Sequence, residues 1–238
     1  MIKPQQDSQI SKKLQVAKMF DSIAKSYDFL NHTLSFGMDF YWRKKAISKL
    51  TNNPKKILDV ACGTADFAIA TSKLNGVHIT GIDISKNMLE IGRKKVEKKG
   101  LEKQIKLEFA DSENLPFENE SFDAITAGFG VRNFENLQLG LSEMRRVLKK
   151  DGIVVILEPS KPKYFPIKQI YSAYFHHILP FFGQLISKDK RAYNYLPESV
   201  DAFPENEKFI EILKEVGFSK VKYLPLTLGI VSLYIAIK

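Results

Sequence analysis

Short apolar runs and longer amphipathic stretches alternate along residues 54–160. The runs are typical of strands buried on both faces, and the stretches between them repeat their apolar positions with the period of a helix. Strands interleaved with helices predict βαβ units and a parallel sheet covered by helices. We expect strands at Ile57–Val60, His78–Asp83, Ile105–Ala110, Ala124–Gly128 and Ile153–Glu158, with helices at Asp66–Leu74, Lys86–Lys99 and Leu137–Leu148.

The segments on either side have different patterns. Residues 160–204 are rich in aromatic residues and prolines and lack the alternation. The end of the chain has two short apolar runs that suit an antiparallel sheet edge. The remaining expected elements are helices at Ser11–Ala24, Asp39–Leu50 and Asn206–Val216 and strands at Val221–Pro225 and Ser232–Ile237.

These patterns predict a single domain over residues 1–238. Its core would comprise about residues 54–160 and 205–238, with an amino-terminal helical lid over about 11–50 and an inserted helical cap over about 161–204. A chain of 238 residues with 44% hydrophobic content is long and apolar enough to bury a substantial core.

A tight turn follows the first strand. Residues 57–66 read Ile-Leu-Asp-Val-Ala-Cys-Gly-Thr-Ala-Asp, in which Asp59 lies near the strand's carboxyl end and Gly63 lets a ligand approach the backbone. Asp83 ends the next strand, at the roughly 20-residue spacing at which a carboxylate binds ribose hydroxyls in doubly wound folds. The sequence therefore predicts a nucleotide site at the carboxyl edge of the sheet.

The same turn favours one class of nucleotide. Ala61 and Ala65 flank the single Gly63, so the Gly-x-Gly-x-x-Gly of dinucleotide sites is missing, as is a triphosphate-binding loop. Carboxylates attract cationic groups. An acidic turn therefore suits S-adenosylmethionine, which carries sulfonium and ammonium groups.

Composition excludes several classes of protein. The single cysteine, Cys62, excludes a disulfide framework and a cysteine zinc site. The amino terminus is polar, without the apolar core of a signal peptide, and no apolar run approaches the length of about 20 residues that spans a membrane. We expect a cytoplasmic protein.

The formal net charge of +9 makes nucleic acid and an anionic membrane candidate partners. Much of the charge lies on helix faces such as residues 93–99, which are typically solvated. An RNA-modifying methyltransferase would be one alternative, with catalytic Asn-Pro-Pro-Tyr after the fourth strand. Residues 127–130 instead read Ala-Gly-Phe-Gly, so no nucleic-acid partner is expected.

Three segments carry a resemblance to a known family. Residues 27–43 contain Tyr-Asp-x-x-Asn, Ser-x-Gly and Trp-Arg; residues 129–133 read Phe-Gly-Val-Arg-Asn; residues 146–160 contain Arg-Val-Leu-Lys, Gly and Glu-x-Ser. In this order they are similar to the signatures of the ubiquinone/menaquinone biosynthesis C-methyltransferases, which are class I S-adenosylmethionine-dependent methyltransferases. The resemblance extends from about Phe20 to the carboxyl terminus.

The chain departs from the family at four places. Leu30 stands where the family often has Met, and Asp39 where it often has His. Lys150-Asp151 replaces the usual Pro-Gly, and Gly128 replaces a Ser. Asp39 is the departure with most consequence, because His and Asp differ in charge and in proton transfer.

The resemblance implies an α/β, Rossmann-like class I methyltransferase fold: a seven-stranded mixed sheet, mostly parallel, with an antiparallel last strand. It implies that Thr64 holds the carboxylate of S-adenosylmethionine, that Asp83 holds the ribose, and that the two residues after the third strand hold the adenine. No metal ion is expected. The expected cofactor site is Asp59, Gly63, Thr64, Asp83, Asp111 and Ser112.

The resemblance also implies C-methylation of a polyprenyl quinol ring, most closely demethylmenaquinol to menaquinol. Ubiquinone biosynthesis, or methylation of another lipophilic small molecule, remains an alternative. Arg132 would stabilise the phenolate that activates the ortho carbon. Tyr27 and Asp28 would close over the site, whereas His176 and His177 are expected to be structural.

Polyprenyl quinols reside in the bilayer, so we expect peripheral contact with anionic lipid, at the inner face of the cell membrane, through residues 160–195. The oligomeric state is left open, and an oligomer is compatible with the sequence. The expected basic rim is Lys161, Lys163, Lys168, Lys188, Lys190 and Arg191, against the single acid Asp189.

Overall fold

A mixed seven-stranded sheet forms the centre of the computed structural model, which describes residues 2–6, 8–175 and 190–238. The strand order is β3-β2-β1-β4-β5-β7-β6, and β7 is antiparallel to both of its neighbours while the other pairs are parallel. This confirms the expected mixed sheet with an antiparallel last strand. The strands are β1 (Lys56–Val60), β2 (His78–Asp83), β3 (Ile105–Phe109), β4 (Phe122–Gly128), β5 (Leu148–Pro159), β6 (Ser219–Leu226) and β7 (Val231–Ile237).

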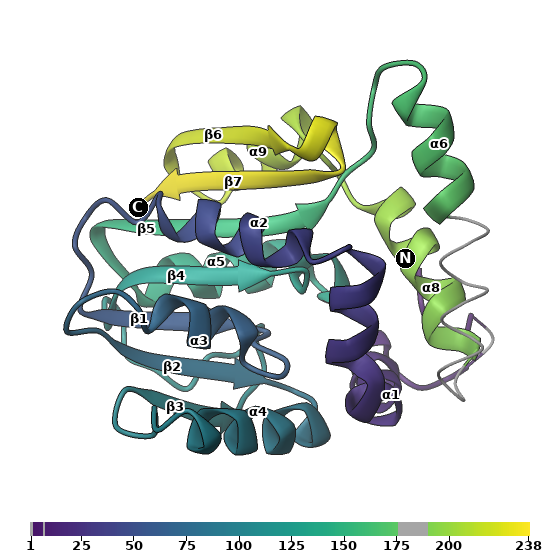
Figure 1. Ribbon diagram of the computed structural model, residues 1–238. Helices are drawn as coiled ribbons and strands as arrows, with labels where there is room; N and C mark the ends of the chain where they lie inside the picture. The colour runs from purple at the N-terminus through teal and green to yellow at the C-terminus, as the bar shows by residue number, and fades with distance from the viewer. Residues whose placement is uncertain (1, 7, 176–189) are drawn as a thin grey trace.

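Helices cover both faces of the sheet and one of its ends (Figure 1). Helices α2, α3 and α4 lie on one face and α5 and α9 on the other, while α1, α6 and α8 gather beyond the carboxyl ends of the parallel strands. The bounds are α1 (Lys12–Leu34), α2 (Met38–Ile47), α3 (Asp66–Thr71), α4 (Lys86–Lys98), α5 (Leu137–Val147), α6 (Ile167–Ala173), α8 (Lys190–Ala202) and α9 (Glu207–Glu215), with short 3-10 turns η1 (Val131–Asn133) and η3 (Thr227–Gly229).

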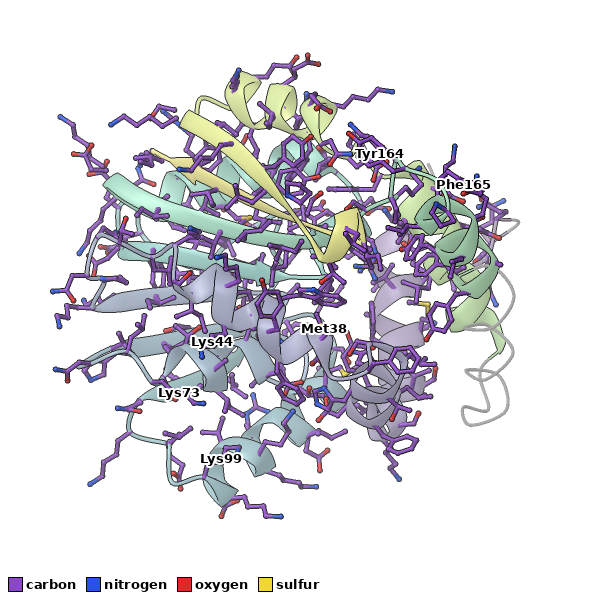
Figure 2. All side chains as sticks on the ribbon, turned by 45° about the horizontal axis from the view of Figure 1, so that its top comes forward. Met38, Lys44, Lys73, Lys99, Tyr164 and Phe165 are labelled. Atoms are coloured by element: carbon purple, nitrogen blue, oxygen red, sulfur yellow. The ribbon has the colours of Figure 1, made fainter. Side chains whose placement is uncertain are left out.

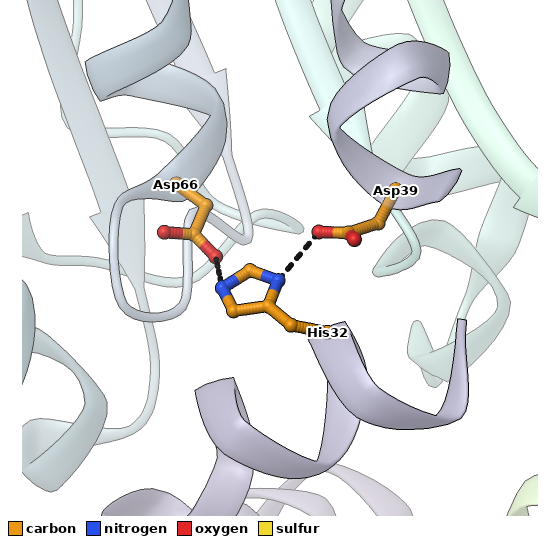
Figure 3. Close-up of side chains that lie close together, drawn as sticks. All are labelled: His32, Asp39 and Asp66. Carbon is orange, nitrogen blue, oxygen red and sulfur yellow. Dashed lines mark hydrogen bonds and ion pairs between the residues drawn. The ribbon is translucent and has the colours of Figure 1, made fainter. Parts of the chain in front are cut away.

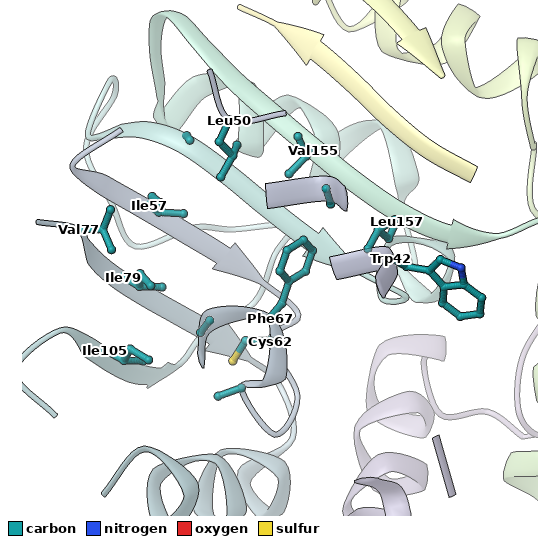
Figure 4. Packing of buried hydrophobic residues seen from close by; sticks show 14 of the residues in the cluster. Trp42, Leu50, Ile57, Cys62, Phe67, Val77, Ile79, Ile105, Val155 and Leu157 are labelled. Carbon is teal, nitrogen blue, oxygen red and sulfur yellow. The ribbon is translucent and has the colours of Figure 1, made fainter. Parts of the chain in front are cut away.

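Two hydrophobic cores explain the continuous apolar runs of the strands. Ile57 packs beneath α2 and α3 with Phe67 (Figure 4), whereas its neighbour Leu58 belongs to the opposite core, beneath α5. Successive side chains of a strand point to opposite faces, so a strand covered on both faces has a nearly continuous run of apolar residues.

Helix α1 is the largest difference from the expected elements. It begins with a capping bond from the Leu14 N–H to the Ser11 hydroxyl but continues to Leu34, well beyond the expected end at Ala24. Its second half presents Tyr27 and Asn31 to a cavity rather than to a solid core. Cavity walls mix polar and apolar residues, so this half lacks the apolar periodicity used to predict helices.

Within the described part of the chain, no helix is both long and apolar enough to cross a membrane.

Candidate active site

The turn between β1 and α3 has an unusual backbone. Ala61, Gly63 and Ala65 all adopt left-handed φ angles of 53°, 54° and 68°. The Gly63 N–H donates to Asp83 Oδ2 over 2.8 Å, which ties the turn to the end of β2. A Cβ at Gly63 would lie 4.0 Å from the Tyr27 ring, an ordinary van der Waals contact, so the left-handed φ and not a lack of space favours glycine here.

A cavity of about 60 Å³ lies against this turn at the carboxyl ends of the parallel strands. Four of the six predicted cofactor residues line it: Gly63, Asp83, Asp111 and Ser112. Asp83 also accepts from the Ser85 N–H over 2.8 Å, and burial raises the pKa of Asp83 to about 6. The structure therefore brings these four residues together in one cavity wall, and their contact with a cofactor stays a prediction.

Lys13 of α1 reaches into the same cavity. Its ammonium lies 2.5 Å from Asp111 Oδ2 and 3.2 Å from Glu113 Oε2. The preceding residue, Lys12, donates to the backbone carbonyls of Arg132 and Phe134 over 3.2 and 2.7 Å. Sequence reasoning missed both lysines, because nothing distinguishes them from solvated lysines of an amphipathic helix. They fasten the start of α1 over the cavity.

Asp59 and Thr64 line neither of the cavities described here. Asp59 is fully buried and accepts from the Thr126 hydroxyl over 2.7 Å, and burial raises its pKa to about 7. Its Oδ2 atom has no hydrogen-bond partner among the described residues. The Thr64 hydroxyl donates to Asp28 over 2.5 Å. Direct contact of either side chain with a cofactor stays a prediction.

A second, larger cavity of about 180 Å³ adjoins the first. Its walls are mostly aromatic and aliphatic side chains of α1, α2, α6 and α8, with the ends of β5 and β7. Four residues line both cavities, namely Phe20, Tyr27, Phe129 and Asn133. The cavity lined by Asp83, Asp111 and Ser112 and the larger aromatic cavity therefore meet at one junction.

Two arginines line the larger cavity, Arg43, which pairs with two aspartates, and Arg132, which pairs with Glu158. Nη1 of Arg132 lies 3.0 Å from Glu158 Oε2 and also donates to the Phe129 carbonyl, and its Nε donates to Ser199 Oγ over 3.4 Å. The remaining nitrogen, Nη2, makes no hydrogen bond to the described residues. This nitrogen is the donor left for a ligand.

Glu158 holds Arg132 in place and was not singled out from the sequence as a site residue. It is 0% exposed, and its Oε1 accepts from the backbone N–H groups of Val131 and Arg132 over 2.7 and 3.3 Å. Burial raises the pKa of Glu158, and the Arg132 charge opposes that rise. Its position near the carboxyl end of β5, like that of Asp83 at the end of β2, was the available signal.

Tyr27 and Asp28 are neighbours in sequence but belong to different surroundings. Tyr27 sits at the junction of the cavities, packs edge-on against Phe20 with ring centroids 5.9 Å apart, and has its pKa raised by burial. Asp28 instead lies 2.6 Å from Lys95 Nζ and lines neither cavity. The structure places Tyr27 in the same cavity wall as Arg132. Asp28 is not part of that wall. His176 and His177 lie outside the described residues.

An ion-pair network connects the larger cavity to the β1–α3 turn. His32 lies between two carboxylates, with its Nδ1 2.7 Å from Asp39 and its Nε2 3.5 Å from Asp66 (Figure 3). Arg43 pairs with both carboxylates, and Lys95 also pairs with Asp66. Although burial opposes it, the hydrogen bond from Arg43 lowers the pKa of the Asp39 carboxyl.

The ligand atoms of His32, Asp39 and Asp66 lie within 4.8 Å of one another, a grouping that could hold a metal ion. Two side-chain cations, Arg43 and Lys95, already pair with these carboxylates. The carboxylates that would bind a metal ion are therefore already paired with protein cations. The cluster ties α1 and α2 to the turn between β1 and α3.

Comparison with known proteins gives consistent matches over nearly the whole chain. The model of the ubiE/COQ5 methyltransferase family matches residues 8–238. A relative from Bacteroides fragilis, named demethylmenaquinone methyltransferase, is 50% identical over 94% of this chain and 92% of its own. One from Geotalea daltonii, named ubiquinone/menaquinone biosynthesis C-methyltransferase, is 46% identical over 92% and 94%.

Solved structures agree on the fold. A methyltransferase dependent on S-adenosylmethionine from Thermotoga maritima superposes with a TM-score of 0.65 at 18% identity, covering 93% of this chain and 99% of that one. Another from Aquifex aeolicus gives 0.57 at 18% identity, covering 84% and 91%. At these identities the likeness shows the class I methyltransferase fold.

Proposed function

The chain belongs to the ubiE/COQ5 methyltransferase family, and from this premise we propose that it methylates a ring carbon of a polyprenyl naphthoquinol, converting demethylmenaquinol to menaquinol. The observation that carries the proposal is the junction at Tyr27, where an apolar cavity containing Arg132 adjoins a cavity lined by Asp83 and Asp111. One cavity suits a lipophilic ring and the other a nucleoside, so a transfer between them would cross the junction.

The described residues fit S-adenosylmethionine in the smaller cavity. Asp83 would accept from the ribose hydroxyls, while Asp111 and Ser112 would hold the adenine edge. Lys13 would have to release Asp111 for that contact. The cofactor supplies a methyl group already activated by its sulfonium, so we propose that the reaction needs no metal ion.

Arg132 and Glu158 would perform the central task of the protein. The quinol must lose a phenolic proton to water before its ortho carbon becomes a strong nucleophile, and Nη2 of Arg132, which makes no hydrogen bond to the described residues, would stabilise the resulting phenolate. Glu158 would keep the guanidinium fixed, so no reorganisation is needed when charge develops. Tyr27 and Phe129 at the junction would keep water out and align the ring.

The test is direct. The protein is incubated with methyl-labelled S-adenosylmethionine and demethylated naphthoquinol or benzoquinol, each reduced and oxidised, and products are identified by mass. We expect labelled menaquinol from the reduced naphthoquinol. Faster methylation of the benzoquinol would favour a role in ubiquinone biosynthesis, and no transfer to either ring would refute a quinol substrate.

We also propose peripheral contact with the membrane through the loop before α6. Tyr164 and Phe165 project from its tip at the outer edge of the molecule (Figure 2), and Phe165 is 81% exposed. Ile170 of α6 and Leu228 of η3 are exposed as well. Aromatic residues on an exposed tip suit insertion at the level of lipid headgroups.

The positive charge of the expected basic rim is smaller than the sequence implied, because two of its lysines lie close to acidic residues. Lys161 lies 3.5 Å from Asp201 and 3.9 Å from Glu205, and Lys163 lies 3.7 Å from Glu207. Lys188 and Asp189 lie outside the described residues, as do the side chains of Lys190 and Arg191. Apolar insertion should therefore contribute more than charge.

Flotation with liposomes tests the membrane proposal. Tyr164→Ser with Phe165→Ser should reduce flotation severalfold, whereas raising the salt concentration should reduce it less. A wild-type protein that fails to float with anionic liposomes at low salt would refute the contact.

A further inference from the structure

Two buried tyrosine hydroxyls in the wall of the larger cavity have no hydrogen-bond partner among the described residues. Tyr171 comes from α6 and is 9% exposed, and Tyr195 comes from α8 and is 3% exposed. Leaving a buried hydroxyl unpaired costs stability, and the great majority of buried polar groups are paired. Two such groups in one cavity wall therefore point to a ligand that completes them.

Other tyrosines of the protein behave differently. Tyr174 lines the same cavity, but its hydroxyl donates to the Leu34 carbonyl over 2.7 Å. Tyr234 is buried in the core, and its hydroxyl accepts from the Asn206 N–H over 2.7 Å. The unpaired state is thus specific to Tyr171 and Tyr195 among these four.

Both unpaired phenols remain O–H donors at neutral pH. Burial raises the pKa of Tyr195 to about 12 and raises that of Tyr171 further. The Arg132 charge is close enough to oppose both rises. Two tyrosines that are neutral donors therefore share one cavity wall with the guanidinium groups of Arg132 and Arg43, a set suited to ring oxygens that carry partial or full negative charge.

We propose that Tyr171 and Tyr195 bind the ring oxygens of an aromatic diol or its phenolate in the larger cavity. A para-quinol has oxygens on opposite edges of its ring, and these donors come from two different helices. The inference rests on the proposed function, because that function supplies a ligand with such oxygens. The two tyrosines would position the ring, whereas Arg132 would stabilise the charge that develops during reaction.

The roles separate kinetically. A contact made equally in the ground state and the transition state changes KM and leaves kcat nearly unchanged. Tyr171→Phe or Tyr195→Phe should therefore raise KM for the quinol about tenfold, the loss typical of one hydrogen bond in a buried site. The affinity for S-adenosylmethionine should not change.

Binding can be measured without turnover. Trp42, the only tryptophan of the chain, lines the same cavity, so its fluorescence should be quenched by a naphthoquinol there. The probe is a short-tailed 2-prenyl-1,4-naphthoquinol, added anaerobically to protein saturated with S-adenosylhomocysteine. The comparison ligand is 2-prenylnaphthalene, which has the same apolar surface but no oxygens.

We expect each Phe variant to lose about tenfold in affinity for the naphthoquinol and nothing for the hydrocarbon. The melting temperature of the ligand-free variants should equal or exceed that of the wild type, because an unpaired hydroxyl is removed. Tyr234→Phe is the matched control: its melting temperature should fall, because the Asn206 N–H loses its acceptor, while its affinity for the naphthoquinol stays unchanged.

Two results would overturn the inference, and they are distinguishable. If the wild type binds and methylates the naphthoquinol and both Phe variants bind it equally well, the hydroxyls do not hold its oxygens and the proposed function stands. If the wild type neither binds nor methylates it, both proposals fail together.

Discussion

Replacing Arg132 with lysine isolates the role of the guanidinium. Arginine pairs with Glu158 through Nη1 and still has Nη2 for a ligand, whereas lysine has a single ammonium. Glu158 is fully buried, and leaving such a carboxylate unpaired costs about 3–5 kcal/mol. A charged hydrogen bond to a phenolate contributes about 1.5–3 kcal/mol. The ammonium of Arg132→Lys should therefore stay with Glu158, and the phenolate loses its donor.

We expect kcat to fall about 10²-fold, which corresponds to roughly 2.7 kcal/mol of transition-state stabilisation and matches the loss of one preorganised donor. Since the pair with Glu158 survives, the free energy of unfolding should change by about 1 kcal/mol or less. Affinity for S-adenosylmethionine should also be retained, because Arg132 does not line the smaller cavity.

The assay is single-turnover methylation of the reduced naphthoquinol, with cofactor binding followed by calorimetry and stability by urea unfolding. Arg145→Lys is the matched control, since Arg145 is on α5 and contacts the Gly217 carbonyl over 3.0 Å, away from both cavities. A variant at position 132 that reacts at the wild-type rate, or that fails only because it unfolds or cannot bind cofactor, would refute the reasoning.

Three further predictions follow from the buried charges. Because burial raises the pKa of Asp83 to about 6, affinity for cationic S-adenosylmethionine should rise from pH 5 to pH 7 and then level off. In calorimetry, Asp83→Asn should bind S-adenosylmethionine weakly, and its affinity should not depend on pH in this range. Asp59 has a pKa of about 7 in the folded protein, whereas the unfolded chain releases this proton near pH 4. Wild-type stability is therefore lost as the pH rises from about 4 to about 7. The ionised carboxylate costs up to about 4 kcal/mol, and Asp59→Asn should be the more stable protein at pH 8, by about 1–3 kcal/mol after the unpaired amide is counted. For the network, His32→Asp combined with Asp39→His should unfold closer to wild type than either single variant, because the exchange restores an imidazole–carboxylate hydrogen bond between the two positions; urea unfolding should give a coupling of about 1 kcal/mol or more.

Each of these has a clear contrary result. If the affinity for S-adenosylmethionine does not change between pH 5 and pH 7, ionisation of Asp83 does not control cofactor binding. A less stable Asp59→Asn at pH 8 would mean that the carboxylate has a partner that the structure does not describe. Additive effects at His32 and Asp39 would mean that their contact contributes nothing.

Local sequence patterns were sufficient for the sheet and for the turn after β1. Strands buried on both faces contain runs of consecutive apolar residues, so Ile57-Leu58 of β1 and residues 153–157 of β5 are visible without tertiary information. The turn at Gly63 and the carboxylate of Asp83 follow from strand ends and from spacing along the chain. Family signatures added Arg132, whose surroundings no local pattern describes.

Only the tertiary structure decided which side chains share a site. Asp59 and Asp83 read alike in sequence, but Asp83 is the last residue of β2 and reaches the cavity, whereas Asp59 is one residue inside β1 and is covered. Tyr27 and Asp28 differ because successive helix positions face different directions, and the packing of α1 selects which one meets the cavity.

The sequence by itself therefore determined the fold, the family and the carboxyl edge of the sheet as the place of the site. Tertiary packing determined the set of groups around Arg132: Glu158 from β5, Tyr171 from α6 and Tyr195 from α8. The physical reason is the separation along the chain over which each kind of interaction acts. Periodicity and turn chemistry depend on neighbours a few residues apart, whereas pairing of a buried charge or hydroxyl depends on segments that meet only when the chain has folded.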